Sequence, residues 1–130
     1  MPSRTPPTTG RVLVVDDDER VRMIFMRHLT TAGFDVVAVS GAAEGLRVLR
    51  DEGNICLVLL DLAMPEMNGL EFREQQLADA RISGIPVVIV TGSPVAAEDR
   101  EQLQAVDYLA KPVGREELIG VVARWCRVQP

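Results

Sequence analysis

Residues 55–61 read Ile-Cys-Leu-Val-Leu-Leu-Asp, six apolar residues in succession followed by an aspartate. An unbroken apolar run of this length is typical of a strand that is covered on both faces, as the interior strands of parallel α/β sheets are. Residues 12–15 and 85–90 form two more apolar runs. These three runs predict the interior of a parallel sheet.

The segments around these runs alternate between helical and extended patterns, with no internal repeat. Strands 34–39 and 108–110 are mixed or short and suit sheet edges, which with right-handed crossovers gives the strand order 2-1-3-4-5 and helices on both faces. The predicted fold is therefore a doubly wound five-stranded parallel α/β sheet. Asp18 and Ser40 are expected to cap the first two helices. The five helices are expected over residues 19–32, 41–50, 69–79, 96–105 and 116–127.

A polar side chain follows each apolar run. These residues are Asp16 and Asp17, Asp61, Thr91 and Lys111. The carboxyl ends of parallel strands face the same way and form the ligand crevice of an open α/β sheet, so these groups should meet there. Clustered carboxylates repel one another, and a hard divalent cation resolves that repulsion. The pattern predicts a site for a divalent metal and a phosphoryl group. On this reasoning alone, Asp16→Asn should stabilise the metal-free fold.

Length and charge limit the classes of protein to which this chain can belong. A chain of 130 residues with 47 % hydrophobic residues has room for one domain, expected over residues 11–128. The net charge of −5 argues against direct nucleic-acid binding. No apolar stretch approaches the roughly 18 residues of a membrane span. Residues 1–10 are rich in Pro, Ser and Thr and predict a flexible N-terminal extension, so we expect a cytoplasmic protein without a membrane partner.

The two cysteines, Cys56 and Cys126, are isolated in the sequence and lack the spacing of a zinc site. A cytoplasmic location favours free thiols over a disulfide. The sequence therefore predicts two partly buried thiols.

Four fragments together resemble the receiver domain of two-component response regulators. They are Val-Leu-Val-Val-Asp-Asp-Asp (12–18), Leu-Val-Leu-Leu-Asp-Leu-Ala-Met-Pro-Glu-Met-Asn-Gly-Leu (57–70), Val-Val-Ile-Val-Thr-Gly (87–92) and Asp-Tyr-Leu-Ala-Lys-Pro (107–112). The resemblance covers residues 11 to about 128. It implies a phosphoacceptor that works in phosphorelay signal transduction.

The resemblance also assigns the site. Asp61 is the expected phosphorylation site and Mg²⁺ the expected cofactor, with Asp17 and Asp61 as direct ligands, Asp16 as a ligand through water and the carbonyl of Ala63 completing the set. Lys111, followed by Pro112 and an expected cis bond, would contact the phosphoryl group.

The switch residues implied by the resemblance are Thr91 and Tyr108. The implied partners are a histidine kinase or histidine phosphotransfer protein and an unknown output protein. A homodimer through the fourth helix, fifth strand and fifth helix is a further arrangement of such domains. Arg22, Met23, Met26 and Arg27, on the outer side of the first helix, are either a kinase-docking surface or plain surface. His28 is expected to be packed or half-exposed.

The expected role is that of a signalling phosphoacceptor, which catalyses only its own phosphorylation and dephosphorylation. The sequence ends after the fifth helix, so no output domain is expected in this chain; a receiver fragment of a hybrid kinase or larger regulator is one alternative. An aspartyl-nucleophile phosphatase is another, but it would need a second Asp two residues after Asp61, where Ala63 stands. A receiver used only as a binding module is the third.

Overall fold

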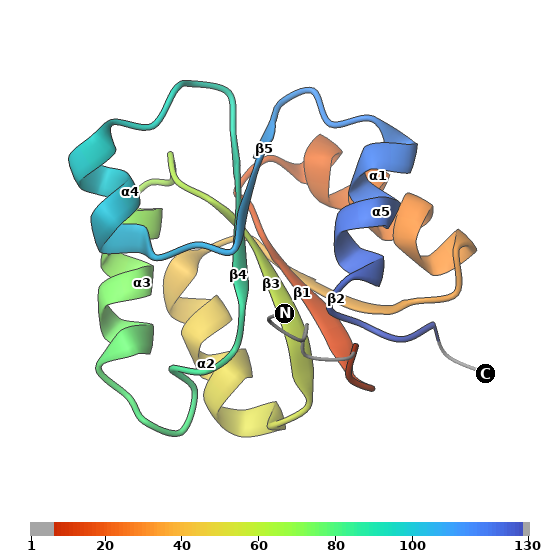
Figure 1. Cartoon of the computed structure of the whole chain (residues 1–130), viewed down its shortest axis with the longest axis horizontal. Helices are drawn as coiled ribbons and strands as arrows, with labels where there is room; N and C mark the ends of the chain where they lie inside the picture. Colours follow the sequence, from red (N-terminus) through yellow and green to blue (C-terminus); the bar gives the residue numbers. More distant parts are fainter. Residues whose placement is uncertain (1–6, 129–130) are drawn as a thin grey trace, which may run out of the picture.

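The structure, a computed structural model, describes residues 7–128. Strands and helices alternate along the chain (Figure 1). The strands are β1 (Arg11–Val15), β2 (Asp35–Val39), β3 (Ile55–Asp61), β4 (Val87–Thr91) and β5 (Asp107–Ala110). The helices are α1 (Glu19–Thr31), α2 (Ala42–Glu52), α3 (Gly69–Leu77), α4 (Ala97–Leu103) and α5 (Arg115–Ala123).

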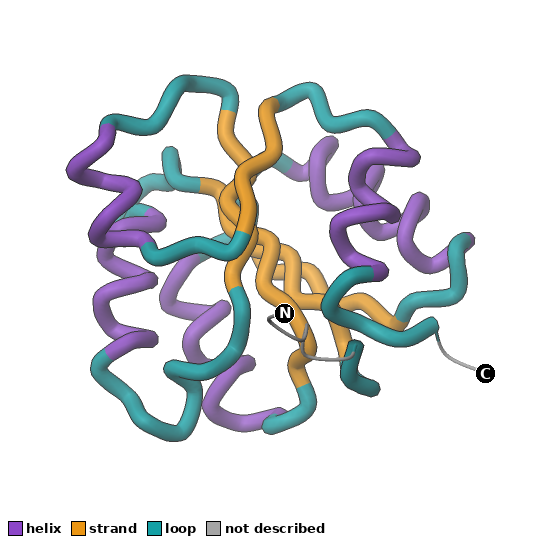
Figure 2. Tube along the Cα trace, viewed as in Figure 1, coloured by secondary structure: helices purple, strands orange, loops and turns teal. Residues whose placement is uncertain are grey.

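The five strands form one parallel sheet in the order β2-β1-β3-β4-β5. This confirms the predicted strand order and the predicted edges. Helices α1 and α5 cover one face, and α2, α3 and α4 cover the other (Figures 1 and 2). All seven residues of β3 are buried, as its unbroken apolar run predicts.

The core consists of two apolar clusters, one on each face of the sheet. Val12 and Val14 of β1 belong to the cluster under α1 and α5, whereas Leu13 and Val15 belong to the cluster under α2 and α3. Successive side chains of a strand point to opposite faces, so every interior strand must supply both clusters. This is why the interior strands lack polar positions.

Two caps differ in how well the sequence predicts them. Asp18 caps α1, because its carboxylate accepts a hydrogen bond from the backbone N–H of Arg20 at 2.9 Å. The prediction that Ser40 caps α2 is wrong. Gly41 is the N-cap residue and has no side chain to accept a bond, and glycine is tolerated there because the N-cap backbone is extended.

The prediction of two free thiols is also wrong, since Cys56 and Cys126 form a disulfide with a Cα–Cα distance of 5.5 Å. They are 70 residues apart in the sequence. The second residue of β3 and the segment after α5 meet on the same face of the sheet. This contact arises from tertiary packing, and the spacing of the two cysteines in the sequence does not predict it.

Part of the predicted N-terminal extension lies outside the described residues. In its described part, Thr8 pairs with Cys126 as an isolated parallel bridge. The Thr8 N–H donates to the carbonyl of Trp125, and the Arg127 N–H donates to the carbonyl of Thr8, both at 3.0 Å. Within residues 7–128, none of the helices combines the length and apolar character that a membrane-spanning segment requires.

Candidate functional site

Three carboxylates meet at the carboxyl ends of β1 and β3. Asp16 follows β1 directly and Asp61 ends β3, and these strands are neighbours, with Val15 opposite Leu60. One ligand oxygen from each of Asp16, Asp17 and Asp61 lies within 4.8 Å of the others. Asp16 and Asp61 are buried, whereas Asp17 is exposed. The cluster therefore has two inner carboxylates and one at its mouth.

Lys111 places an ammonium group between the inner carboxylates. It follows β5, and its Nζ lies 3.0 Å from Oδ2 of Asp16 and 3.6 Å from Oδ2 of Asp61. Its backbone N–H donates to the carbonyl of Thr91 at 2.9 Å, and the Lys111–Pro112 peptide bond is cis. One buried cluster thus combines groups from β1, β3 and the loop after β5.

These charges change the titration of the site. Burial raises the pKa of the Asp61 carboxyl, and the charge of Asp16 raises it further, while Lys111 acts in the opposite direction. Burial alone would lower the pKa of Lys111, but the hydrogen bond and charge of Asp16 raise it overall. Because the pKa of Asp61 is higher in the folded state, its contribution to stability falls as the pH rises through that pKa. Added positive charge at the cluster should therefore stabilise the fold at neutral pH.

Backbone groups hold the inner carboxylates in place. Oδ1 of Asp16 accepts the N–H of Asp18 at 2.9 Å, and Oδ1 of Asp61 accepts the N–H of Ala63 at 3.3 Å. Arg22 donates from Nη1 to the carbonyl of Asp16 at 2.7 Å. Arg22 therefore supports the site through the backbone of Asp16, a role beyond the two alternatives of docking surface and plain surface that the sequence left open. Sequence reasoning missed this role, because the helical pattern does not show the direction in which the Arg22 side chain points.

Gly69 brings the first turn of α3 against the loop that follows Asp61. Its N–H donates to the carbonyl of Leu62 at 3.1 Å. A Cβ at this position would lie 2.9 Å from the carbonyl oxygen of Asp61 and 2.6 Å from Cδ2 of Leu62. Only glycine fits this approach without displacing backbone. The loop after Asp61 is thus fixed by close packing as well as by the Ala63 hydrogen bond.

Thr91 ends β4 beside the cluster, one residue beyond the Asp61–Val90 pair in the β3–β4 register. Its hydroxyl accepts the N–H of Ser93 at 3.2 Å and donates to the carbonyl of Ser93 at 3.3 Å. A threonine that closes a turn in this way is held by weak bonds, so its hydroxyl can be redirected at little cost.

Tyr108, the other predicted switch residue, is half-buried in β5. The guanidinium of Arg100 on α4 lies over its ring, 4.1 Å from the ring centroid. A cation over a tyrosine face is attracted by the ring quadrupole. This contact joins α4 to β5, and neither the spacing nor the periodicity of the sequence signals it.

The residues present fit a hard divalent metal. Mg²⁺ prefers oxygen ligands and is commonly bound through one or two carboxylates together with waters. The cluster supplies three carboxylates, one of them exposed, and the described residues place neither a thiol nor an imidazole among them. The ammonium of Lys111 already compensates part of their charge, so a bound cation would share Asp16 and Asp61 with it.

The Lys111–Asp16 contact reverses the expectation that Asp16→Asn stabilises the metal-free fold. The 3.0 Å bond to a buried carboxylate is charge-assisted, and Asp16 is 2 % exposed. Losing that charge should lower the free energy of unfolding by about 1–2 kcal/mol without metal. Urea unfolding in EDTA measures this change. An unchanged or raised midpoint would show that carboxylate repulsion outweighs the ion pair.

Comparisons with known proteins identify the family of the chain. Residues 12–123 match the family model for the response regulator receiver domain. Two-component response regulator ORR5 of Oryza sativa subsp. japonica is 32 % identical over 118 residues, which cover 89 % of this chain and 88 % of that protein. The crystal structure of a response regulator receiver protein from Pseudomonas putida superposes with a TM-score of 0.81 at 32 % identity, covering 88 % of this chain and 96 % of that one.

Longer proteins contain a similar segment. Sensory/regulatory protein RpfC of Xanthomonas campestris pv. campestris is 39 % identical over 118 residues, which cover 87 % of this chain but 16 % of RpfC. The chain spans less than half the length of the first curated relatives that it matches, 16 %, 14 % and 47 % of each.

Proposed function

Because this chain belongs to the response regulator receiver domain family and is a receiver domain of two-component systems, we propose that the carboxylate of Asp61 accepts a phosphoryl group in a magnesium-dependent step. The donor is a histidine kinase or a histidine phosphotransfer protein. The observation that carries this proposal is the meeting of three carboxylates and the Lys111 ammonium at the carboxyl ends of β1 and β3.

In the proposed step, one Asp61 oxygen forms a bond to phosphorus while the bond from phosphorus to the donor nitrogen breaks. Asp61 needs no general base, because it is the ionised carboxylate that attacks. Lys111, 3.6 Å from Asp61, offsets the charge that gathers as the phosphoryl group approaches. Asp17 and Asp61 would hold Mg²⁺ directly, with Asp16 through water and the Ala63 carbonyl, and the metal would supply positive charge to the phosphoryl oxygens.

The phosphoryl group would then change the loop after β4. The Thr91 hydroxyl, which is bonded to Ser93, would turn to a phosphoryl oxygen and draw this loop toward Asp61. Tyr108 would follow into the space vacated, leaving the Arg100 guanidinium. The modified state shifts an equilibrium between two conformations, because only one of them offers the Thr91 hydrogen bond.

The test is the intact mass of the protein after incubation with magnesium and acetyl phosphate. We expect one phosphoryl increment, labile to base. Asp61→Asn should lose the increment completely, and so should wild-type protein in EDTA. A matched control is Asp17→Asn, which keeps the nucleophile and should reduce the rate. A mass increment of equal size in Asp61→Asn would show that a residue other than Asp61 carries the phosphoryl group.

We further propose that the histidine-bearing partner docks on α1. Met23 is 61 % exposed and Ile24 is 50 % exposed. Phe25 and Leu29 are the buried residues of α1, while Met26, expected on the outer side, packs half-buried against the core. Exposed neighbours of this size form an apolar patch of the kind that marks an interaction site.

The patch continues to the phosphoryl site. Met23 and Ile24 line a hollow of about 470 Å³ with Arg20, Arg27 and the half-buried His28. A second hollow of about 300 Å³ shares Ile24 and reaches Lys111, Pro112 and Val113. A partner seated on α1 would therefore extend to the loop that carries Lys111.

Substitution of this patch should separate docking from chemistry. Ile24→Glu is expected to slow transfer from a phosphorylated histidine phosphotransfer protein by roughly tenfold or more, since a buried anchor is lost at the interface. Its rate with acetyl phosphate should not change. Val128→Glu is the matched control, because Val128 is an exposed valine (54 %) that follows α5. Equal slowing with both donors would refute a docking role.

The remaining assignments rest on family membership. We propose that residues 11–128 act as one domain in the cytoplasm, where reduction of the Cys56–Cys126 disulfide would leave two free thiols. We also propose that the protein is a signalling phosphoacceptor and not a phosphatase. Ala63 supports the latter, because it offers no side chain for acid–base chemistry two residues after Asp61. An output protein, or a second copy of the chain, would meet the surface formed by α4, β5 and α5. Arg100 and Tyr108 would carry the change in Asp61 to that surface.

A further inference from the structure

Arg73 is a buried cation in the interior of α3, with 4 % of its surface exposed. Its guanidinium donates from Nε to the carbonyl of Leu103 at 2.6 Å and from Nη2 to the carbonyl of Gln104 at 3.0 Å. Nη1 donates to the side-chain oxygen of Gln76 at 2.8 Å. Arg73 therefore caps the end of α4 from the side of α3.

The charge of Arg73 lacks an anionic partner. Among residues 7–128, no carboxylate lies within 4.0 Å of its guanidinium, and burial lowers its pKa. The carbonyls at the end of α4 offer only partial negative charge. A guanidinium has five N–H groups, so three hydrogen bonds leave a second N–H on each terminal nitrogen. A buried charge without a counterion is costly and is a ready partner for an anion.

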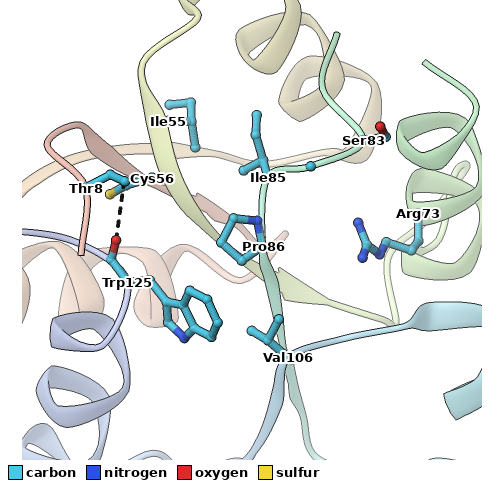
Figure 3. Close-up of a pocket in the computed structure, with 10 residues that line it drawn as sticks. Thr8, Ile55, Cys56, Arg73, Ser83, Ile85, Pro86, Val106 and Trp125 are labelled. Atoms are coloured by element: carbon cyan, nitrogen blue, oxygen red, sulfur yellow. Dashed lines mark hydrogen bonds between the residues drawn. The ribbon is translucent and has the colours of Figure 1, made fainter. Parts of the chain in front are cut away.

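Arg73 lines a cavity of about 400 Å³ at the amino ends of β3, β4 and β5. In Figure 3, Arg73 and the indole of Trp125 lie on opposite sides of the cavity, and Pro86 and Val106 lie between them. This is the opposite end of the sheet from Asp61, and the seven residues of β3 separate the two places by roughly 20 Å. The cavity is thus independent of the carboxylate cluster.

We propose that this cavity binds a small organic monocarboxylate with a flat aromatic body. The carboxylate would accept from the second N–H of Nη1 and of Nη2, beyond the one hydrogen bond that each of them makes, and the aromatic body would pack on Trp125 and Pro86. The volume is within the range of small-molecule sites. Of residues 7–128, Arg73 is the only cation in the cavity wall, which favours a single negative charge with an apolar body over inorganic phosphate.

The chain has one tryptophan, so its indole N–H resonance reports directly on this cavity. Titration with 2-naphthoate should shift the Trp125 indole resonance saturably. The neutral isostere 2-naphthamide should bind more weakly by roughly tenfold or more, because it lacks the charge-assisted bonds. Equal binding of the two probes, or no shift with either, would overturn the proposal.

Substitution of Arg73 would also remove three hydrogen bonds, so the site is better tested at Val106, which is 42 % exposed at the rim. Val106→Glu places a negative charge there and should weaken 2-naphthoate binding roughly tenfold relative to Val106→Gln. Both variants should keep the wild-type melting temperature and the magnesium response of the carboxylate cluster. Equal affinity in these two folded variants would refute a carboxylate on Arg73.

Discussion

Lys111→Met is expected to lower the free energy of unfolding of the metal-free protein by about 3 kcal/mol, and magnesium is expected to restore much of the loss. The ammonium of Lys111 lies 3.0 Å from Asp16 and 3.6 Å from Asp61. Both carboxylates are buried, at 2 % and 5 % exposed, so its removal leaves two uncompensated negative charges in the crevice. A divalent cation bound to the same carboxylates replaces the missing charge and stabilises the fold by linkage.

Urea unfolding with EDTA and with saturating magnesium measures both effects. Lys111→Arg is the matched control, because it keeps a positive charge and should lose far less stability. The difference between Lys111→Met and wild type should therefore be large in EDTA and small in magnesium. The same deficit in both buffers would mean that Lys111 acts through packing of its aliphatic chain, and that the carboxylates do not depend on its charge.

The sheet could be predicted because interior strands, which are buried on both faces, have sequences without polar positions. The run from Ile55 to Leu60 has no polar position, since both faces of β3 are covered, and this alone places β3 inside the sheet. The mixed pattern of residues 34–39 places β2 at the edge for the same reason. The meeting of Asp16 and Asp61 follows from the parallel arrangement, which brings the ends of β1 and β3 to one side.

The side-chain directions within the site could not be predicted. The sequence places Lys111 near the carboxylates but does not show that its ammonium binds Asp16 more closely than Asp61. Arg22 stands at a surface position of α1 by periodicity, yet its long side chain folds back to the carbonyl of Asp16. The direction of a long side chain such as Arg22 depends on its rotamer and on neighbouring charges, and the hydrophobic pattern of the sequence contains neither.

The disulfide was missed for a different reason. The prediction of free thiols rested on the expected compartment, a property of the cell and not of the chain. The fold brings Cys56 of β3 beside Cys126, and both side chains are buried, at 4 % and 2 % exposed. Proximity of this kind arises from two elements that pack on one sheet face, so it can be read only after the topology is known.

Removal of the Cys56–Cys126 disulfide should lower the free energy of unfolding by more than Lys111→Met does. The cross-link closes a loop of about 70 residues, and the chain-entropy model assigns a loop of this length about 4 kcal/mol, through restriction of the unfolded state. The double variant Cys56→Ala with Cys126→Ala should therefore unfold at a much lower urea concentration than oxidised wild type. The described hydrogen bonds of Thr8 with Trp125 and Arg127 should weaken as well, because they flank Cys126.

Wild-type protein with and without dithiothreitol provides the matched comparison. Reductant should lower the midpoint of the wild type toward that of the double variant, and it should leave the double variant itself unchanged. Magnesium binding at the opposite end of the sheet should persist in all samples, since Asp61 lies at the far end of β3 from Cys56. If reductant leaves the wild-type midpoint unchanged while mass spectrometry shows free thiols, packing of the segment after α5 against β3 suffices without the cross-link, and the entropic argument fails for this protein.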